Sequence, residues 1–143
     1  MRRLCPTLDA TREFARELLT LLEPGQCWIL DGAVGAGKTT FTRLLLGALE
    51  YRGLFQSPTF TLVQEYGPFP PRLGLVRHAD FYRLPPGTRA ESLGSEEWFE
   101  DGSLIFVEWA QRLPGFEALA THRLSIEPAG GEARLFVAHR LAP

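Results

Sequence analysis

The feature that most constrains this chain is the segment from residue 32 to residue 39, which reads GAVGAGKT. It fits the pattern of a glycine, four free positions, a second glycine, a lysine and a serine or threonine. Glycines allow the backbone to turn tightly around a polyphosphate, so that successive N–H groups point at its oxygens. In such a loop Lys38 supplies positive charge for the outer phosphates, in binding and in catalysis, and the Thr39 hydroxyl binds Mg²⁺. The predicted nucleotide-binding residues of this segment are Val34, Gly35, Ala36, Gly37, Lys38, Thr39 and Thr40.

The sequence on either side supports a phosphate-binding loop. Residues 27–30 form an apolar run typical of a buried strand, and residues 40–49 have the apolar spacing of a helix. Strand, loop and helix must follow in this order, because the helix adds the positive end of its dipole to the site. The fifteen basic residues are fourteen Arg and a single Lys, Lys38, which indicates a site that needs a compact ammonium. The alternative is a glycine-rich turn whose Lys only reaches solvent.

Length and charge limit the remaining possibilities. A chain of 143 residues is expected to form one domain, here a phosphate-loop domain over residues 1–143. A formal net charge of -2 argues against a broad nucleic-acid-binding face. Neither a long apolar run nor a cleavable signal opens the sequence, so we expect a cytoplasmic protein without a membrane segment.

The apolar patterns along the chain predict an α/β fold like that of P-loop NTPases, with a mostly parallel central sheet flanked by helices. A helix capped by Thr7 precedes the first strand. After the loop helix, the expected elements are strands at 60–66, 73–79 and 104–109, a helix at 90–99, and strands at 122–127 and 133–139. The last two strands alternate apolar and polar residues around a glycine-rich turn. We therefore expect an antiparallel C-terminal hairpin that closes one edge of the sheet.

Two carboxylates follow predicted strands at the edge of the sheet where a ligand would lie. Asp80 comes directly after one strand, and Glu108 lies near the end of another. In open α/β sheets the ligand binds beyond the carboxyl ends of the strands, so both acids can face a nucleotide. We predict that Thr39 and Glu108 hold Mg²⁺ and that Asp80 orients or deprotonates the attacking water. The alternatives are the reverse assignment of the two acids, and acids that are merely exposed at strand ends.

Three threonines each have two interpretations. Thr59 follows the loop helix, in a region where a hydroxyl of phosphate-loop proteins often senses the terminal phosphate. Alternatively, residues 57–59 only begin a strand, since the residue before a proline favours extended backbone. Thr7 and Thr11 can reach an adenine edge or a ribose, but the spacing around Thr7 favours a helix cap.

The base can be predicted from what the sequence lacks. Guanine-specific switch proteins usually read their base with an Asn-Lys-x-Asp segment. This chain has no Asn, and its one Lys is committed to the phosphate loop. The expected cofactors are therefore ATP, with ADP as its product, and Mg²⁺.

Four segments together resemble the bacterial TsaE family, formerly YjeE. They are the phosphate loop at 32–40, Ser-Pro-Thr-Phe at 57–60, His-Ala-Asp-Phe-Tyr-Arg-Leu at 78–84, and Val-Glu-Trp at 107–109. The resemblance covers nearly the whole chain. It implies a small ATPase that acts on a TsaB–TsaD complex in the threonylcarbamoyl modification of adenosine 37, in tRNAs that read ANN codons. Such a protein meets tRNA only through the complex, does not transfer the threonylcarbamoyl group, and is expected to be a monomer when alone.

The resemblance also carries roles to particular positions. It places Lys38 and Thr39 on phosphate and magnesium, Thr59 in a switch-like segment, Asp80 and Glu108 as site acids, and Thr7 or Thr11 near the base. Many members have Asp-Leu after the first loop glycine, where this chain has Ala-Val, at positions that the general motif leaves free. Many also carry Gly-Arg ahead of a further Arg near the C-terminus, where this chain reads Gly-Gly-Glu-Ala-Arg at 130–134. Arg134 is the remaining candidate to stack on the adenine.

Two functions of other classes compete with this prediction. A small-molecule kinase uses the same loop but needs an acceptor pocket and an arginine-bearing lid. A nucleotide-gated binding module uses the loop without significant catalysis.

Overall fold

The structure is a computed structural model of the chain and describes residues 1–58 and 61–142. Within these residues, seven strands form one mixed sheet in the order β1-β7-β6-β2-β5-β4-β3. In chain order the elements are β1 (Arg2–Cys5), α1 (Leu8–Leu19), β2 (Cys27–Asp31), α2 (Lys38–Ala48), β3 (Val63–Tyr66), β4 (Val76–Asp80), α3 (Ala90–Leu93), α4 (Glu96–Glu100), β5 (Leu104–Glu108), the 3-10 helices η1 (Ala110–Arg112) and η2 (Phe116–Leu119), β6 (His122–Pro128) and β7 (Arg134–Arg140).

The centre of the sheet is parallel and its flanks are antiparallel. β2 lies between β5 and β6 and pairs with both in parallel, and β5 pairs in parallel with β4. β3 is antiparallel to β4, and β7 is antiparallel to β6. The parallel centre of the sheet and the antiparallel C-terminal hairpin predicted from the sequence are thus confirmed.

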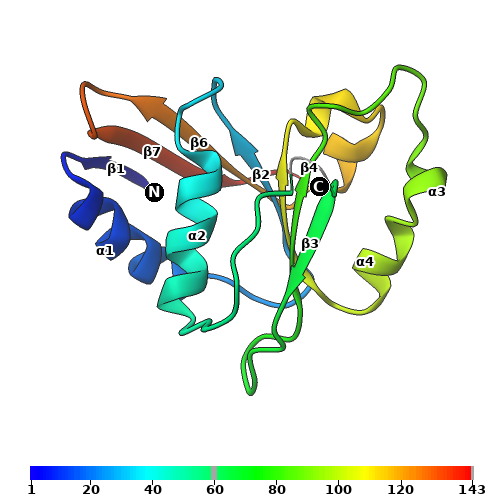
Figure 1. Cartoon of the computed structure of the whole chain (residues 1–143), viewed down its shortest axis with the longest axis horizontal. Coiled ribbons are helices and arrows are strands. Elements are labelled where there is room, and N and C mark those ends of the chain that lie inside the picture. The colour runs from blue at the N-terminus through cyan, green and yellow to red at the C-terminus, as the bar shows by residue number, and fades with distance from the viewer. Residues whose placement is uncertain (59–60, 143) are drawn as a thin grey trace.

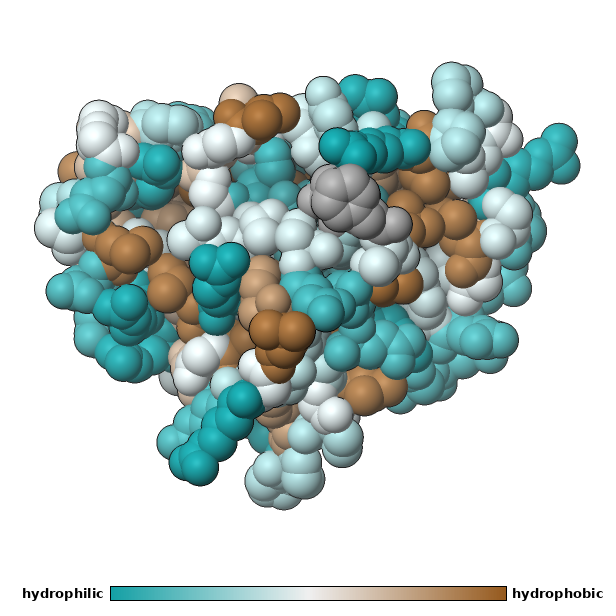
Figure 2. All heavy atoms as spheres, in the orientation of Figure 1, coloured by the Kyte–Doolittle hydropathy of each residue, from teal (hydrophilic) through white to brown (hydrophobic). Residues whose placement is uncertain are grey.

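Alternate residues of the central strands face two separate cores, as expected for strands that are covered on both sides. On β2, Trp28 and Leu30 join the core that includes α1 and α2, whereas Cys27 and Ile29 join the opposite core. Figure 1 shows α1 and α2 together on one side of the sheet and α3 and α4 on the other. On the face seen in Figure 2, hydrophobic residues form small groups separated by hydrophilic ones. The largest fully buried side chains all belong to these two cores.

The hairpin does not close the edge of the sheet, contrary to the prediction. β1 pairs with β7 in antiparallel register and forms the edge strand itself. Its sequence, RRLC, begins with two arginines and has no alternating pattern, so nothing local marks it as a strand. Pairing with a strand at the other end of the chain stabilises it instead.

The strands expected at 60–66 and 73–79 begin at Val63 and Val76 in the structure.

Two further elements are changed by single left-handed residues. The helix expected at 90–99 is divided into α3 and α4 at Gly94, which has φ 67°. The strand expected at 104–109 ends at Glu108, since Trp109 has φ 59° and turns the chain out of the sheet.

Candidate functional site

The GAVGAGKT loop connects the carboxyl end of β2 to the first turn of α2. It starts against β6: a Cβ on Gly32 would lie 2.6 Å from the main-chain oxygen of Ile126, so no larger residue fits without moving the loop. Gly37 is the N-cap of α2 and has φ 110°, which favours glycine. Because this cap has no side chain, the first N–H groups of α2 stay available to an anion. They lie at the positive end of the helix dipole, which makes the loop an anion-binding site.

The Lys38 ammonium is held over the inside of this loop. Its Nζ donates hydrogen bonds to the main-chain oxygens of Gly32 and Ala33, the latter at 3.2 Å. It also lies 4.6 Å from the centre of the Trp109 ring, within range of a cation–π interaction. The charge is therefore kept at the loop, where a phosphate oxygen can take the place of either carbonyl.

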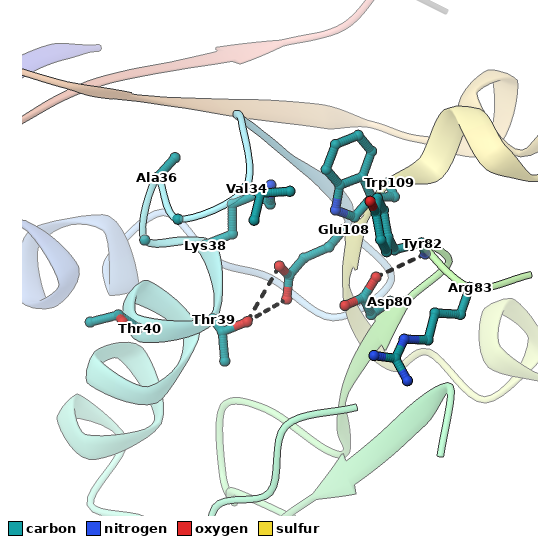
Figure 3. Close-up of a pocket in the computed structure, with 12 residues that line it drawn as sticks. Val34, Ala36, Lys38, Thr39, Thr40, Asp80, Tyr82, Arg83, Glu108 and Trp109 are labelled. Carbon is teal, nitrogen blue, oxygen red and sulfur yellow. Dashed lines mark hydrogen bonds between the residues drawn. The ribbon is translucent and has the colours of Figure 1, made fainter. Parts of the chain in front are cut away.

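The Glu108 carboxylate joins the phosphate loop to the sheet. It is only 3% exposed, and it accepts the Thr39 hydroxyl at 3.0 Å on Oε2 and at 3.3 Å on Oε1. Figure 3 shows these two bonds from the first turn of α2 to the end of β5. On the other side, His78 Nε2 lies 2.6 Å from Oε2. A hydroxyl and a carboxylate are oxygen ligands of the kind that Mg²⁺ prefers, so the pair fits this ion.

Asp80 lies on the neighbouring strand in register with Glu108, which brings two carboxylates to one edge of the sheet. Its Oδ1 accepts the main-chain N–H of Tyr82 at 2.9 Å. Burial raises the pKa of Asp80, and the nearby Glu108 carboxylate adds to this effect, while the Tyr82 N–H opposes it. A raised pKa favours proton uptake, as a general base requires.

These groups line one cavity of about 390 Å³ at the carboxyl edge of the sheet. Its walls are Val34, Gly35, Ala36, Gly37, Lys38, Thr39, Thr40, Asp80, Tyr82, Arg83, Glu108 and Trp109 (Figure 3). All of the loop residues predicted to bind nucleotide are therefore brought together with both predicted acids. The size is within the range of small-molecule sites.

Two aromatic residues that line this cavity, Tyr82 and Trp109, have no role predicted from the sequence. Tyr82 and Trp109 lie with ring centroids 4.9 Å apart, and the Arg112 guanidinium lies 5.0 Å from the Tyr82 centroid. Val34, on the loop side, has 74% of its surface exposed. Each of the two aromatic residues follows a strand-end acid by at most two positions, and this spacing could have identified them as site residues.

A second, smaller cavity of about 180 Å³ lies on the other side of the loop and is lined in part by α1 and β7. Its walls are Leu8, Thr11, Gly35, Ala36, Gly37, Thr40, Phe41, Glu132, Arg134 and Phe136. Arg134 donates from Nε to the Ala36 oxygen at 2.7 Å, and from Nη1 to the oxygens of Gly131 and Ala133 at 2.7 and 2.8 Å. Its guanidinium thus bridges the β6–β7 turn and the phosphate loop.

The two threonines proposed to lie near a base have different surroundings in the structure. The Thr7 side chain caps α1 by accepting the Ala10 N–H at 3.1 Å, as the spacing predicted. Thr11 is buried and lines the second cavity, and its hydroxyl donates to the Thr7 main-chain oxygen at 3.3 Å. Thr59 lies outside the described residues.

Comparisons with known proteins agree with this site. A sequence model of the family described as "Threonylcarbamoyl adenosine biosynthesis protein TsaE" matches residues 5–136. The chain belongs to the TsaE family. The match spans the phosphate loop, both acids and Arg134, and it confirms the resemblance drawn from the four sequence motifs.

Individual relatives and a solved structure agree with this assignment. The tRNA threonylcarbamoyladenosine biosynthesis protein TsaE of Bacillus subtilis is 35% identical over 130 residues, 88% of this chain and 77% of that protein. The TsaE protein of Streptomyces coelicolor is 40% identical over 104 residues, 70% of this chain and 67% of that protein. The crystal structure of Bacillus subtilis YdiB superposes with a TM-score of 0.69 at 26% identity, covering 95% of this chain and 82% of that one. The P-loop-like α/β fold is thereby confirmed.

A helix that crosses a membrane must be both long and apolar. In the part of this TsaE-family chain that the structure describes, every helix is too short or too polar to cross a bilayer.

Proposed function

We propose that this TsaE-family chain binds ATP with Mg²⁺ and hydrolyses it in support of the threonylcarbamoyl modification of adenosine 37, in tRNAs that read ANN codons. The observation that carries the proposal is the hydrogen bond between Thr39 and Glu108. It joins a phosphate-loop hydroxyl to a strand-end carboxylate within one cavity, as a magnesium–nucleotide site requires.

Each residue of the larger cavity has a distinct role in this proposal. Lys38 and the N–H groups at the start of α2 bind the outer phosphates and stabilise the charge that develops on them. Thr39 and Glu108 would hold Mg²⁺, which neutralises phosphate charge when it is bound. Asp80 orients the attacking water and accepts its proton, consistent with the direction of its pKa shift. Thr59 contributes a hydroxyl that senses the terminal phosphate.

The second cavity is the proposed place of the adenosine. Thr11 lines it, whereas the Thr7 hydroxyl is already used as a helix cap. Arg134 lines it too, with two of its guanidinium nitrogens bonded to main-chain oxygens. These bonds lie along the edge of the guanidinium, so stacking on a base would use its planar face. Both cavities share Gly35, Ala36, Gly37 and Thr40, so one nucleotide can span them around the loop.

The partner in this proposal is a TsaB–TsaD complex, through which the protein meets tRNA. We take residues 1–143 as a single ATPase domain that is monomeric alone and works in the cytoplasm. A net charge of -2 agrees with an indirect contact to tRNA, because direct binding of nucleic acid favours a basic face.

Phosphate release from ATP, measured with Mg²⁺ in the presence and absence of purified TsaB–TsaD, tests the proposal. We expect slow release by the protein alone and a clear acceleration on addition of the complex. ADP formation that requires a small-molecule hydroxyl acceptor would show a kinase instead. ATP binding without turnover under either condition would show a nucleotide-gated binding module.

A further inference from the structure

His78 lies behind the site, in the middle of β4, and is fully buried. It pairs in register with Phe106, two residues before the end of β5. Side chains two residues apart on a strand share a face, so His78 and Asp80 point to the same side of the sheet. The Phe55 ring stacks near the imidazole, with centroids 6.3 Å apart and planes inclined at 26°. Packing therefore restricts the plane of the imidazole ring.

Within the described part of the chain, the imidazole has a single hydrogen-bond partner, Glu108. Its Nε2 lies 2.6 Å from Glu108 Oε2. A carboxylate can only accept, so Nε2 carries the hydrogen and donates it. The other ring nitrogen, Nδ1, is buried and has no hydrogen-bond partner among residues 1–58 and 61–142. A buried polar atom without a partner destabilises the fold, so this histidine is poorly explained as a structural element alone.

The two oxygens of Glu108 are used unequally. Oε2 accepts from His78 and receives the shorter of the two contacts from Thr39, at 3.0 Å, while the contact to Oε1 is 3.3 Å. Oε1 therefore keeps the larger free acceptor capacity of the two. The N–H of His78 holds the carboxylate in this orientation from the side opposite to the phosphate loop.

We propose that His78 is a positioning residue for the metal site, which orients the Glu108 carboxylate toward the Mg²⁺ that Thr39 and Glu108 would hold. This inference rests on the magnesium site of the proposed function. Residues that hydrogen-bond a metal ligand from behind typically change metal affinity by about 10–100-fold when they are removed. His78 is not among the described residues that line the cavity, and it reaches the site through its contact with Glu108.

Two substitutions distinguish the effect of the His78 hydrogen bond from the effect of its packing. His78→Phe keeps an aromatic ring beside Phe55 but removes the donor. His78→Gln places an amide N–H near the position of Nε2. ADP affinity is measured by calorimetry across a range of Mg²⁺ concentrations, with the thermal midpoint of each variant as the control for folding.

We expect His78→Phe to raise the Mg²⁺ concentration for half-maximal enhancement of ADP binding by about 10–100-fold. ADP affinity without Mg²⁺ should stay unchanged, and His78→Gln should restore most of the loss. An unchanged magnesium dependence in His78→Phe, or equal losses in both variants, overturns the proposal. If the ADP affinity of the wild-type protein does not depend on Mg²⁺, the metal site of the proposed function is itself overturned. This result is distinguishable from a failure of the His78 proposal alone.

A measurement on the wild-type protein keeps the proposal testable even if His78→Phe does not fold. Long-range ¹H–¹⁵N correlation spectra report which ring nitrogen carries the hydrogen. The proposal requires it on Nε2. A hydrogen on Nδ1 with a bare Nε2 overturns it.

Discussion

The Thr39 hydroxyl and the Glu108 carboxylate meet at 3.0 Å although 69 residues separate them in the chain. One comes from the first turn of α2 and the other from the last residue of β5. Because β2 and β5 are adjacent and parallel, the loop after β2 and the end of β5 reach the same edge of the sheet. The fold itself therefore assembles the hydroxyl–carboxylate pair.

Removal of the lysine ammonium tests the phosphate loop. In Lys38→Ala we expect ADP affinity to fall roughly 10- to 150-fold, because a hydrogen bond to a charged group contributes about 1.5–3 kcal/mol. ATP turnover should be lost. Calorimetry and phosphate release measure the two effects. Arg52→Ala is the matched control, since it removes a positive charge from an exposed position beyond the end of α2. Turnover by Lys38→Ala at the wild-type rate would contradict the proposed site.

The two acids should respond differently to magnesium. We expect Glu108→Gln to raise the Mg²⁺ requirement of ADP binding at least about tenfold, since the neutral amide is a weaker ligand. Asp80→Asn should leave that requirement nearly unchanged and slow hydrolysis. Magnesium titrations of ADP binding, followed by single-turnover phosphate release, measure both effects. The opposite pattern would transfer the metal to Asp80 and the water to Glu108.

Arg134 should act on the loop itself. Its bond to the Ala36 oxygen links β7 to the phosphate loop, and a lysine cannot reproduce three carbonyl contacts at once. We expect Arg134→Lys to weaken ADP binding roughly 2- to 10-fold, with and without Mg²⁺. Arg140→Lys, at the exposed far end of the same strand, is the control.

Pyrophosphate distinguishes two roles of Arg134. If the arginine braces the loop, Arg134→Lys weakens pyrophosphate and ADP binding alike. If it stacks on the adenine, only ADP binding weakens. Equal affinities of variant and wild type for both ligands would exclude both roles.

His122 gives a pH prediction away from the nucleotide site. Its ring stacks on Trp28 with centroids 4.3 Å apart. Burial lowers the pKa of His122 below its ordinary value of 6.5, and the charge of Arg140 lowers it further. The unfolded chain then binds the proton more readily, so the free energy of unfolding falls as the pH drops through 6.5.

His122→Phe keeps an aromatic ring on Trp28 but cannot titrate. Between about pH 7 and about pH 5, its free energy of unfolding should decrease less than that of the wild type. Urea titrations at the two pH values measure the difference. Parallel decreases in the two proteins would show that His122 does not contribute.

Local pattern was enough to predict the phosphate loop, the buried strand that precedes it, and the two acids at strand ends. Each of these depends on residues that are close in sequence or on the general rule that parallel strands end at one edge. The family followed from four short segments read together.

The features that the sequence did not predict depend mainly on contacts between residues far apart in the chain. The partner of β1 lies at the other end of the chain, and Arg134 reaches Ala36 across 98 residues. The contact of His78 with Glu108 needs the register of β4 against β5, which no single strand contains. The left-handed turn at Trp109 is also hidden, because tryptophan rarely adopts that conformation.

The contrast between Gly32 and Val34 has a practical consequence for spectroscopy. Position 32 has no room beside the main chain of β6, whereas position 34 projects into solvent at the rim of the larger cavity. The two natural thiols, Cys5 and Cys27, are buried, and burial raises the pKa of both, that of Cys27 to about 12. A cysteine introduced at position 34 would therefore be alkylated selectively on the native background, and a dye attached there would sit beside an incoming triphosphate.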